Sequence, residues 1–201
     1  MNIVDIFPIK IAIIDDFECD QKIIDSLNNL KCIPPINHGV SNFSENTYIF
    51  DDSFYDALSE KIISAVNYYS QVLQLRYDKF QFTQSWVTEC VPGLQHRHHS
   101  HTNSIISGVY YFDTDESSSP IVFCDNAHTS VRFNTLALED EPDLFVVPSI
   151  KNRLVLFPSY LEHSVPVTSV GKRRSLAFNT LPLSKIGSER SFAEIRYDRL
   201  K

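Results

Sequence analysis

Four of the seven histidines lie within one six-residue segment, as His96, His98, His99 and His101. Imidazole nitrogen binds iron, zinc, copper and nickel, so the cluster indicates a metal site without selecting the metal. On a strand, side chains two residues apart share a face. His99 and His101 can therefore bind one ion together, or His96 and His98 can. Considered by itself, the segment could instead be a solvated histidine-rich loop that binds no metal.

A second segment adds candidate residues. His163 follows the run Leu156-Phe157-Pro158, and ten positions later comes Arg173, with Ser175 two residues beyond it. Period-two spacing puts Arg173 and Ser175 on one face of a strand and Arg174 on the other, where we expect a solvated or surface charge. A guanidinium beside a hydroxyl suits a carboxylate, because its planar fork donates two parallel charge-assisted hydrogen bonds.

Most of the elements that must position these side chains are predicted to be strands. After residue 79 the composition turns to β-branched and aromatic residues with a period of two. Strands are predicted near 80–90, 95–101, 105–112, 120–124, 130–136, 144–147, 153–157, 163–168, 173–181 and 191–196. Because turns and not helices separate them, we expect an antiparallel jelly roll over residues 80–201.

The first 79 residues are predicted to support this core. Residues 3–14 indicate one or two strands, 20–30 a short helix and 32–46 a loop. Apolar residues recur every three or four positions after Ser53, the expected N-cap of the best-defined helix. We predict one mainly β (α+β) domain, residues 1–201, with the N-terminal helices packed outside the jelly roll.

Composition and charge limit the classes of function. With 201 residues, of which 43% are hydrophobic, the chain can bury a sizeable core. Its net charge of −7 argues against nucleic acids and anionic membranes as partners. We find neither a signal-peptide pattern nor an apolar run of membrane-spanning length. The 4 cysteines lack metal-knuckle spacing, so we expect free thiols in the cytoplasm.

Taken together, these motifs resemble the Fe(II)/2-oxoglutarate-dependent dioxygenase superfamily, in particular a small branch common in phage and marine bacteria. The resemblance covers nearly the whole chain and is most specific over residues 93–180. It implies a double-stranded β-helix, which is a jelly roll, with iron at one mouth. The matching residues are His99-Ser100-His101-Thr102-Asn103-Ser104, Ser107-Gly108-Val109-Tyr110-Tyr111, Leu156-Phe157-Pro158 with His163, and Arg173-Arg174-Ser175 with Phe178-Asn179.

The resemblance also implies a set of iron ligands. His99 takes the place of the first ligand and His163 that of the distal one. His101 stands where the superfamily usually has Asp or Glu, which is a departure. The branch therefore uses three histidines, or the true pair is His96 and His98, or a carboxylate arrives from elsewhere. The carboxylates considered are Asp113, Asp115 and Asp125.

By the same resemblance, Arg173 and Ser175 hold the distal carboxylate of 2-oxoglutarate. Tyr110 or Tyr111 adds a phenol donor, and Asn103 is a further candidate for binding the cosubstrate. The implied activity uses Fe(II), 2-oxoglutarate and O2, releases succinate and CO2, and hydroxylates an unidentified small molecule or protein side chain.

The alternative function is a non-catalytic, cupin-like metal-binding module or a phage interaction domain. Arg173 and Ser175 favour the enzyme, because a purely structural metal site has no use for a carboxylate clamp. The location is then the cytoplasm, or the host cytoplasm if the gene belongs to a phage. The sequence specifies neither substrate nor oligomeric state, and a homodimer is compatible with it.

Overall fold

A computed structural model describes residues 1, 8–35, 40–77, 79–115, 117–124, 144–169, 171–183 and 185–199. The strand predicted over 130–136 lies outside the described residues, as does Asp125.

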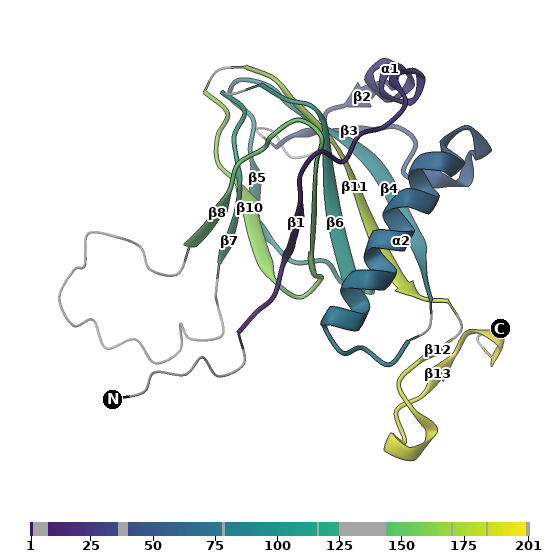
Figure 1. Cartoon of the computed structure of the whole chain (residues 1–201). Coiled ribbons are helices and arrows are strands. Elements are labelled where there is room, and N and C mark those ends of the chain that lie inside the picture. The colour runs from purple at the N-terminus through teal and green to yellow at the C-terminus, as the bar shows by residue number, and fades with distance from the viewer. Residues whose placement is uncertain are drawn as a thin grey trace.

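Two antiparallel sheets form the centre of the fold (Figure 1). The larger sheet has the strand order β1-β9-β6-β11-β4-β3-β2, and the smaller has the order β5-β10-β7-β8. This pair of sheets is the double-stranded β-helix expected from the sequence. The strands are β1 (Ala12–Ile14), β2 (Cys32–Ile33), β3 (Asn42–Ser44), β4 (Phe80–Cys90), β5 (His96–His99), β6 (Ile106–Asp113), β7 (Ile121–Cys124), β8 (Leu144–Val147), β9 (Arg153–Pro158), β10 (Glu162–Val165) and β11 (Arg173–Pro182).

Alternation along β6 divides its side chains between two apolar cores. Tyr110 and Phe112 belong to the core on one face of the larger sheet. Val109 and Tyr111 belong to the other core, between the two sheets, where they meet Phe123 of β7. Both faces of β6 are therefore buried, which explains the unbroken apolar and aromatic run from Val109 to Phe112.

Two helices, α1 (Gln21–Asn29) and α2 (Asp56–Val72), cover the face of the larger sheet that points away from the smaller one (Figure 1). Their buried residues share one core with strand residues such as Leu156 and Phe178. Within the described part of the chain, no helix is both long and apolar enough to cross a membrane. The helix residues in this core are Ile23, Ile24, Leu27, Leu58, Ile62, Val66 and Tyr69.

The start of α2 differs from the prediction. Ser53 is not its N-cap, because a 3-10 turn, Ser53–Tyr55, comes first. The Asp52 carboxylate caps that turn by accepting a hydrogen bond from the Phe54 N–H at 2.9 Å. The N-cap of α2 itself is Tyr55, which makes no side-chain capping bond.

Two other predictions of local structure were wrong. Residues 32–46, expected to be a loop, contain β2 and β3, which pair with each other at the edge of the larger sheet. Of the strand expected over 191–196, only β13 (Ile195–Arg196) forms, paired with β12 (Lys185–Ile186). Strands of two or three residues are too short to leave a period-two signal.

Arg174 is not the solvated charge that we expected, since only 5% of it is exposed. Its Nη1 donates to Glu89 Oε1 at 3.0 Å, and its Nη2 donates to the carbonyl oxygens of Leu27 and Leu30 at 3.3 and 2.8 Å. Carbonyls at the end of a helix have no partner within the helix. Arg174 therefore fastens the end of α1 to the larger sheet.

Candidate active site

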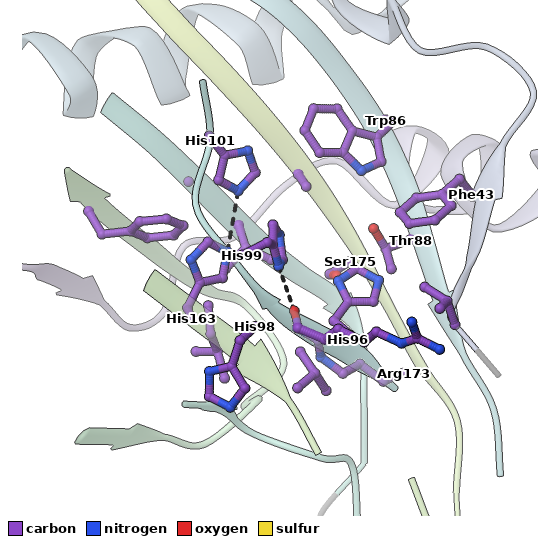
Figure 2. A pocket seen from close by; sticks show the side chains of 18 residues that line it. Phe43, Trp86, Thr88, His96, His98, His99, His101, His163, Arg173 and Ser175 are labelled. Atoms are coloured by element: carbon purple, nitrogen blue, oxygen red, sulfur yellow. Dashed lines mark hydrogen bonds between the residues drawn. The ribbon is translucent and has the colours of Figure 1, made fainter. Parts of the chain in front are cut away.

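A cavity of about 300 Å³ lies between the two sheets (Figure 2). Arg173, Ser175 and Ala177 of β11 line it, while Leu176 and Phe178, between and beyond them, belong to the helix-side core. Other strands of the larger sheet and strands of the smaller sheet form most of the rest of the wall. The remaining lining residues are Val40, Phe43, Trp86, Thr88, His96, Arg97, His98, His99, His101, Gly108, Val109, Ile121, Phe157, His163 and Val165.

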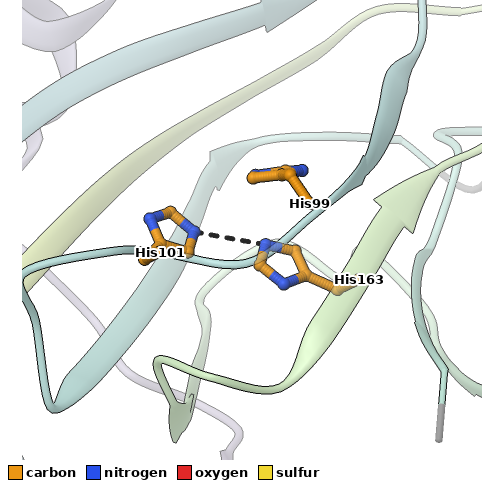
Figure 3. A group of neighbouring side chains, drawn as sticks. All are labelled: His99, His101 and His163. Atoms are coloured by element: carbon orange, nitrogen blue, oxygen red, sulfur yellow. Dashed lines mark hydrogen bonds between the residues drawn. The ribbon is translucent and has the colours of Figure 1, made fainter. Parts of the chain in front are cut away.

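Three histidines come together at one side of this cavity (Figure 3). One ring nitrogen from each of His99, His101 and His163 lies within 4.8 Å of the other two. His99, the last residue of β5, is paired across the strands with His163 of β10. His101 follows β5, and its backbone N–H donates to the carbonyl oxygen of Ser159 at 2.9 Å. The backbone thus fixes all three positions.

Hydrogen bonds set the tautomers of two of these imidazoles. His163 Nδ1 lies 3.0 Å from the Leu161 carbonyl oxygen, and His99 Nδ1 lies 2.8 Å from that of Arg97. A carbonyl oxygen only accepts, so each Nδ1 carries the hydrogen and each Nε2 keeps its lone pair. Both Nε2 atoms are therefore ready to bind a metal ion.

The separation of two of these nitrogen atoms matches that of two ligands on one metal ion. His101 Nε2 and His163 Nε2 are 3.3 Å apart. Metal–nitrogen bonds of about 2.1 Å place adjacent ligand atoms about 3.0 to 3.4 Å apart for bond angles between octahedral and tetrahedral values. The three imidazole donors, and the separation of this pair, therefore suit a first-row divalent metal such as iron.

Burial keeps the imidazoles of His101 and His163 uncharged at neutral pH. Loss of solvent, helped by the nearby His99, lowers the pKa of His163 to about 3 and that of His101 to about 4. Neutral imidazole is the form that binds metal, since protonation removes the lone pair. The metal therefore does not have to displace protons from these two residues at pH 7.

Among the described residues, no carboxylate joins the three histidines. Asp113 pairs with Lys172 at 3.6 Å, and the Asp115 carboxylate accepts hydrogen bonds from the Ser117 N–H and the Ser118 hydroxyl. Neither His96 nor His98 belongs to this three-histidine group, and His98 Nδ1 lies 3.4 Å from the Cys124 Sγ. The described part of the chain thus offers three histidine ligands and no carboxylate at this position.

Arg173 supplies a buried positive charge in the same cavity, with only 2% of it exposed. Its Nε donates to Ser149 Oγ at 3.1 Å and its Nη2 to the Tyr111 hydroxyl at 3.3 Å. Its guanidinium carbon lies 5.0 Å from the centroid of the Tyr111 ring. Both hydrogen-bond partners are neutral, and no carboxylate in the described ranges is paired with it. An uncompensated buried cation is costly, so this end of the cavity suits an anion.

The structure separates Tyr111 from two other residues proposed to bind the cosubstrate. Tyr110 points to the helix side of the sheet, where its hydroxyl donates to Asn152 Oδ1 at 3.4 Å. Asn103 is exposed in the turn before β6, with a φ of 55° that asparagine tolerates. Neither lines the cavity, so these two interpretations are corrected. Tyr111 is the tyrosine that contacts Arg173.

The sequence motifs leave out two residues of the cavity, Trp86 and Thr88, and one residue beside it, Ser149. Trp86 and Thr88 of β4 lie opposite Ala177 and Ser175 of β11. Period-two spacing along β4 would have placed Trp86 and Thr88 on the cavity face once the pairing of β4 with β11 was known. Ser149, which contacts Arg173, lies between strands and belongs to no motif.

Comparison with known proteins gives a match to one protein family. Residues 84–179 match the protein family described as "Putative 2OG-Fe(II) oxygenase". A search of curated proteins returned no match.

Solved structures share the fold at low sequence identity. The α-ketoglutarate-dependent epimerase SnoN from nogalamycin biosynthesis aligns with a TM-score of 0.65 and 9% identity, over 88% of this chain and 80% of that one. HygX from Streptomyces hygroscopicus, with nickel and 2-oxoglutarate bound, aligns with a TM-score of 0.59 and 11% identity, over 87% of this chain and 84% of that one. A Pseudomonas putida prolyl-4-hydroxylase aligns with a TM-score of 0.53 and 13% identity, over 85% of this chain and 92% of that one.

Proposed function

Since this chain belongs to the 2OG-Fe(II) oxygenase family through residues 84–179, we propose that it is a hydroxylase that depends on Fe(II), 2-oxoglutarate and O2. The observation that carries the proposal is one cavity with two complementary features. It contains three imidazoles and a buried guanidinium that has no carboxylate partner among the described residues. A dicarboxylate that also chelates a metal ion satisfies both.

His99, His101 and His163 would hold the Fe(II) ion. When bound, Fe(II) with 2-oxoglutarate and O2 supplies oxidising power, with one oxygen atom passing to succinate, the other to the substrate, and CO2 released. The protein contributes by binding the metal ion and the cosubstrate and by orienting them. The carbonyl oxygens of Leu161 and Arg97 keep His163 and His99 in the tautomer that presents Nε2.

Arg173 and Ser175 would hold the distal carboxylate of the cosubstrate. Ser149 and Tyr111 fix the guanidinium by accepting its hydrogen bonds, which leaves its remaining N–H groups for the ligand. Val109, Ile121 and Phe157 give the cavity an apolar wall that excludes water and strengthens the charge-assisted contacts.

The substrate would enter beside Trp86, whose ring centroid lies 6.1 Å from that of His101. We propose a small molecule or a protein side chain as substrate. The described lining contains arginine but no aspartate or glutamate, which disfavours a cationic group. A neutral or anionic group that presents a C–H bond to the three histidines is the expected class.

The test is turnover with isotopically labelled O2. The Fe(II)-loaded protein should convert 2-oxoglutarate to succinate that carries one labelled oxygen atom, and the same protein loaded with Ni(II) should not. A hydroxylated product carries the second labelled atom, whereas an epimerised product carries none. Tight metal binding without 2-oxoglutarate binding or succinate formation would refute the proposal and indicate a non-catalytic metal-binding module.

A further inference from the structure

One polar side chain of the cavity has no role in the site described so far. His96, on β5, lies opposite Val165 of β10 and packs its ring against Phe43, with centroids 5.4 Å apart. His96 Nε2 is buried and has no hydrogen-bond partner among the described residues. Because leaving a buried polar atom unpaired costs free energy, this atom indicates a partner that the described chain does not supply.

The position of His96 indicates what that partner is. Its ring centroid is 5.9 Å from that of His99, but its nitrogen atoms are not part of the three-nitrogen group. Figure 2 shows His96 on the side of His99 that faces Ser175 and Arg173. His96 therefore borders the space between the proposed metal ligands and the guanidinium.

We propose that His96 Nε2 donates a hydrogen bond to the distal carboxylate of the cosubstrate, together with Arg173 and Ser175. The inference rests on the proposed function. A carboxylate only accepts hydrogen bonds, and a neutral imidazole with hydrogen on Nε2 donates one there. The contact therefore gives both the imidazole N–H and a carboxylate oxygen a hydrogen-bond partner. His96 belongs to the smaller sheet and Arg173 to the larger, so both sheets hold the carboxylate. His96 thus contributes to the selection of a 2-oxo acid with a second carboxylate.

Three variants separate this role from packing. His96→Phe keeps a ring against Phe43 but removes the donor, and His96→Gln restores an N–H near the position of Nε2. His98→Phe is the matched control, because His98 lies on the same strand and also borders the cavity, but its Nδ1 lies 3.4 Å from the Cys124 Sγ. Calorimetry on the anaerobic Fe(II)-loaded proteins measures the dissociation constants of 2-oxoglutarate and of 2-oxobutyrate, which lacks the distal carboxylate. Metal titration of the apoproteins gives an independent readout.

His96→Phe should weaken 2-oxoglutarate binding roughly tenfold to a hundredfold, which is the range for a lost hydrogen bond to a charged group. His96→Gln should recover most of that loss, and His98→Phe should bind like the wild type. Neither the binding of 2-oxobutyrate nor that of Fe(II) should change in the His96 variants. If His96→Phe fails to fold, the ratio of the two dissociation constants in His96→Gln and in His96→Leu gives the same comparison.

Three results would overturn the inference: unchanged 2-oxoglutarate binding in His96→Phe, equal weakening of both acids, or loss of Fe(II). Unchanged binding would mean that His96 does not contact the carboxylate. Equal weakening of both acids would place the contact at the 2-oxo acid end of the cosubstrate, and loss of Fe(II) would make His96 a metal ligand. A wild-type protein that binds Fe(II) but no 2-oxoglutarate refutes the proposed function instead, so the two failures can be told apart.

Discussion

Arg173 and Arg174 are adjacent on β11, yet their guanidinium groups serve different parts of the molecule. Arg173 faces the cavity between the sheets, and Arg174 faces the helices. Replacing each in turn with methionine keeps an unbranched apolar side chain and removes only the charged end. The pair therefore separates binding of the cosubstrate from stability of the fold.

Arg173→Met should weaken 2-oxoglutarate binding to the Fe(II)-loaded protein about tenfold to a hundredfold. A hydrogen bond to a charged group contributes about 1.5 to 3 kcal/mol, and each ~1.4 kcal/mol is a factor of ten. The apoprotein should lose less than about 1 kcal/mol of unfolding free energy, because a buried charge with only neutral partners is removed. Fe(II) binding should not change.

Arg174→Met should have the opposite profile. It removes one partner of a buried ion pair with Glu89 and two hydrogen bonds to carbonyls of α1. Removing one partner of such a pair costs about 3 kcal/mol or more of unfolding free energy. The affinity of the folded protein for 2-oxoglutarate should stay within about threefold of the wild type, far less than the tenfold or larger loss in Arg173→Met.

Urea denaturation of the apoproteins and calorimetry of the Fe(II)-loaded proteins give the two quantities. The reasoning is refuted if Arg174→Met weakens cosubstrate binding more than Arg173→Met does. It is also refuted if Arg173→Met destabilises the apoprotein as much as Arg174→Met.

Three further predictions concern the histidines. His163→Ala should abolish stoichiometric Fe(II) binding while the circular dichroism spectrum stays native, and full-affinity iron in this variant would remove His163 from the site. His101→Asp should retain Fe(II) where His101→Ala loses it, because a carboxylate restores the facial triad of two histidines and one carboxylate; equal metal contents would contradict this. The pKa values of His163 and His101 are lowered to about 3 and 4 from 6.5, so the unfolded chain takes up protons first as pH falls. The apoprotein should therefore lose stability between about pH 6.5 and pH 4, and a urea midpoint constant over that range would be the contrary result.

The sequence was informative where a long strand is paired on both sides. β11 is bordered by β4 and β6, so its side chains alternate regularly, and period-two spacing placed Arg173, Ser175 and Ala177 on one face. The same spacing could not show that the opposite face is covered by the end of α1. That contact joins Arg174 to a segment about 145 residues earlier and leaves no local signal.

The choice between Tyr110 and Tyr111 needed information that the sequence lacks. Both faces of β6 are buried, so hydrophobic patterning does not say which face meets the cavity. The position of His101 could not be predicted from strand spacing either, because His101 lies beyond the end of β5. Its nearness to His163 depends on the hydrogen bond from its backbone to Ser159, which strand spacing does not describe.

A crystal structure of the protein with Fe(II) and 2-oxoglutarate, prepared without oxygen, tests the central claim most directly. We predict one iron ion bound by the Nε2 atoms of His99, His101 and His163, with the distal carboxylate of 2-oxoglutarate within hydrogen-bond distance of Arg173 and Ser175. Iron bound by a side-chain carboxylate such as that of Asp125, or a cosubstrate carboxylate placed away from Arg173, would contradict the account.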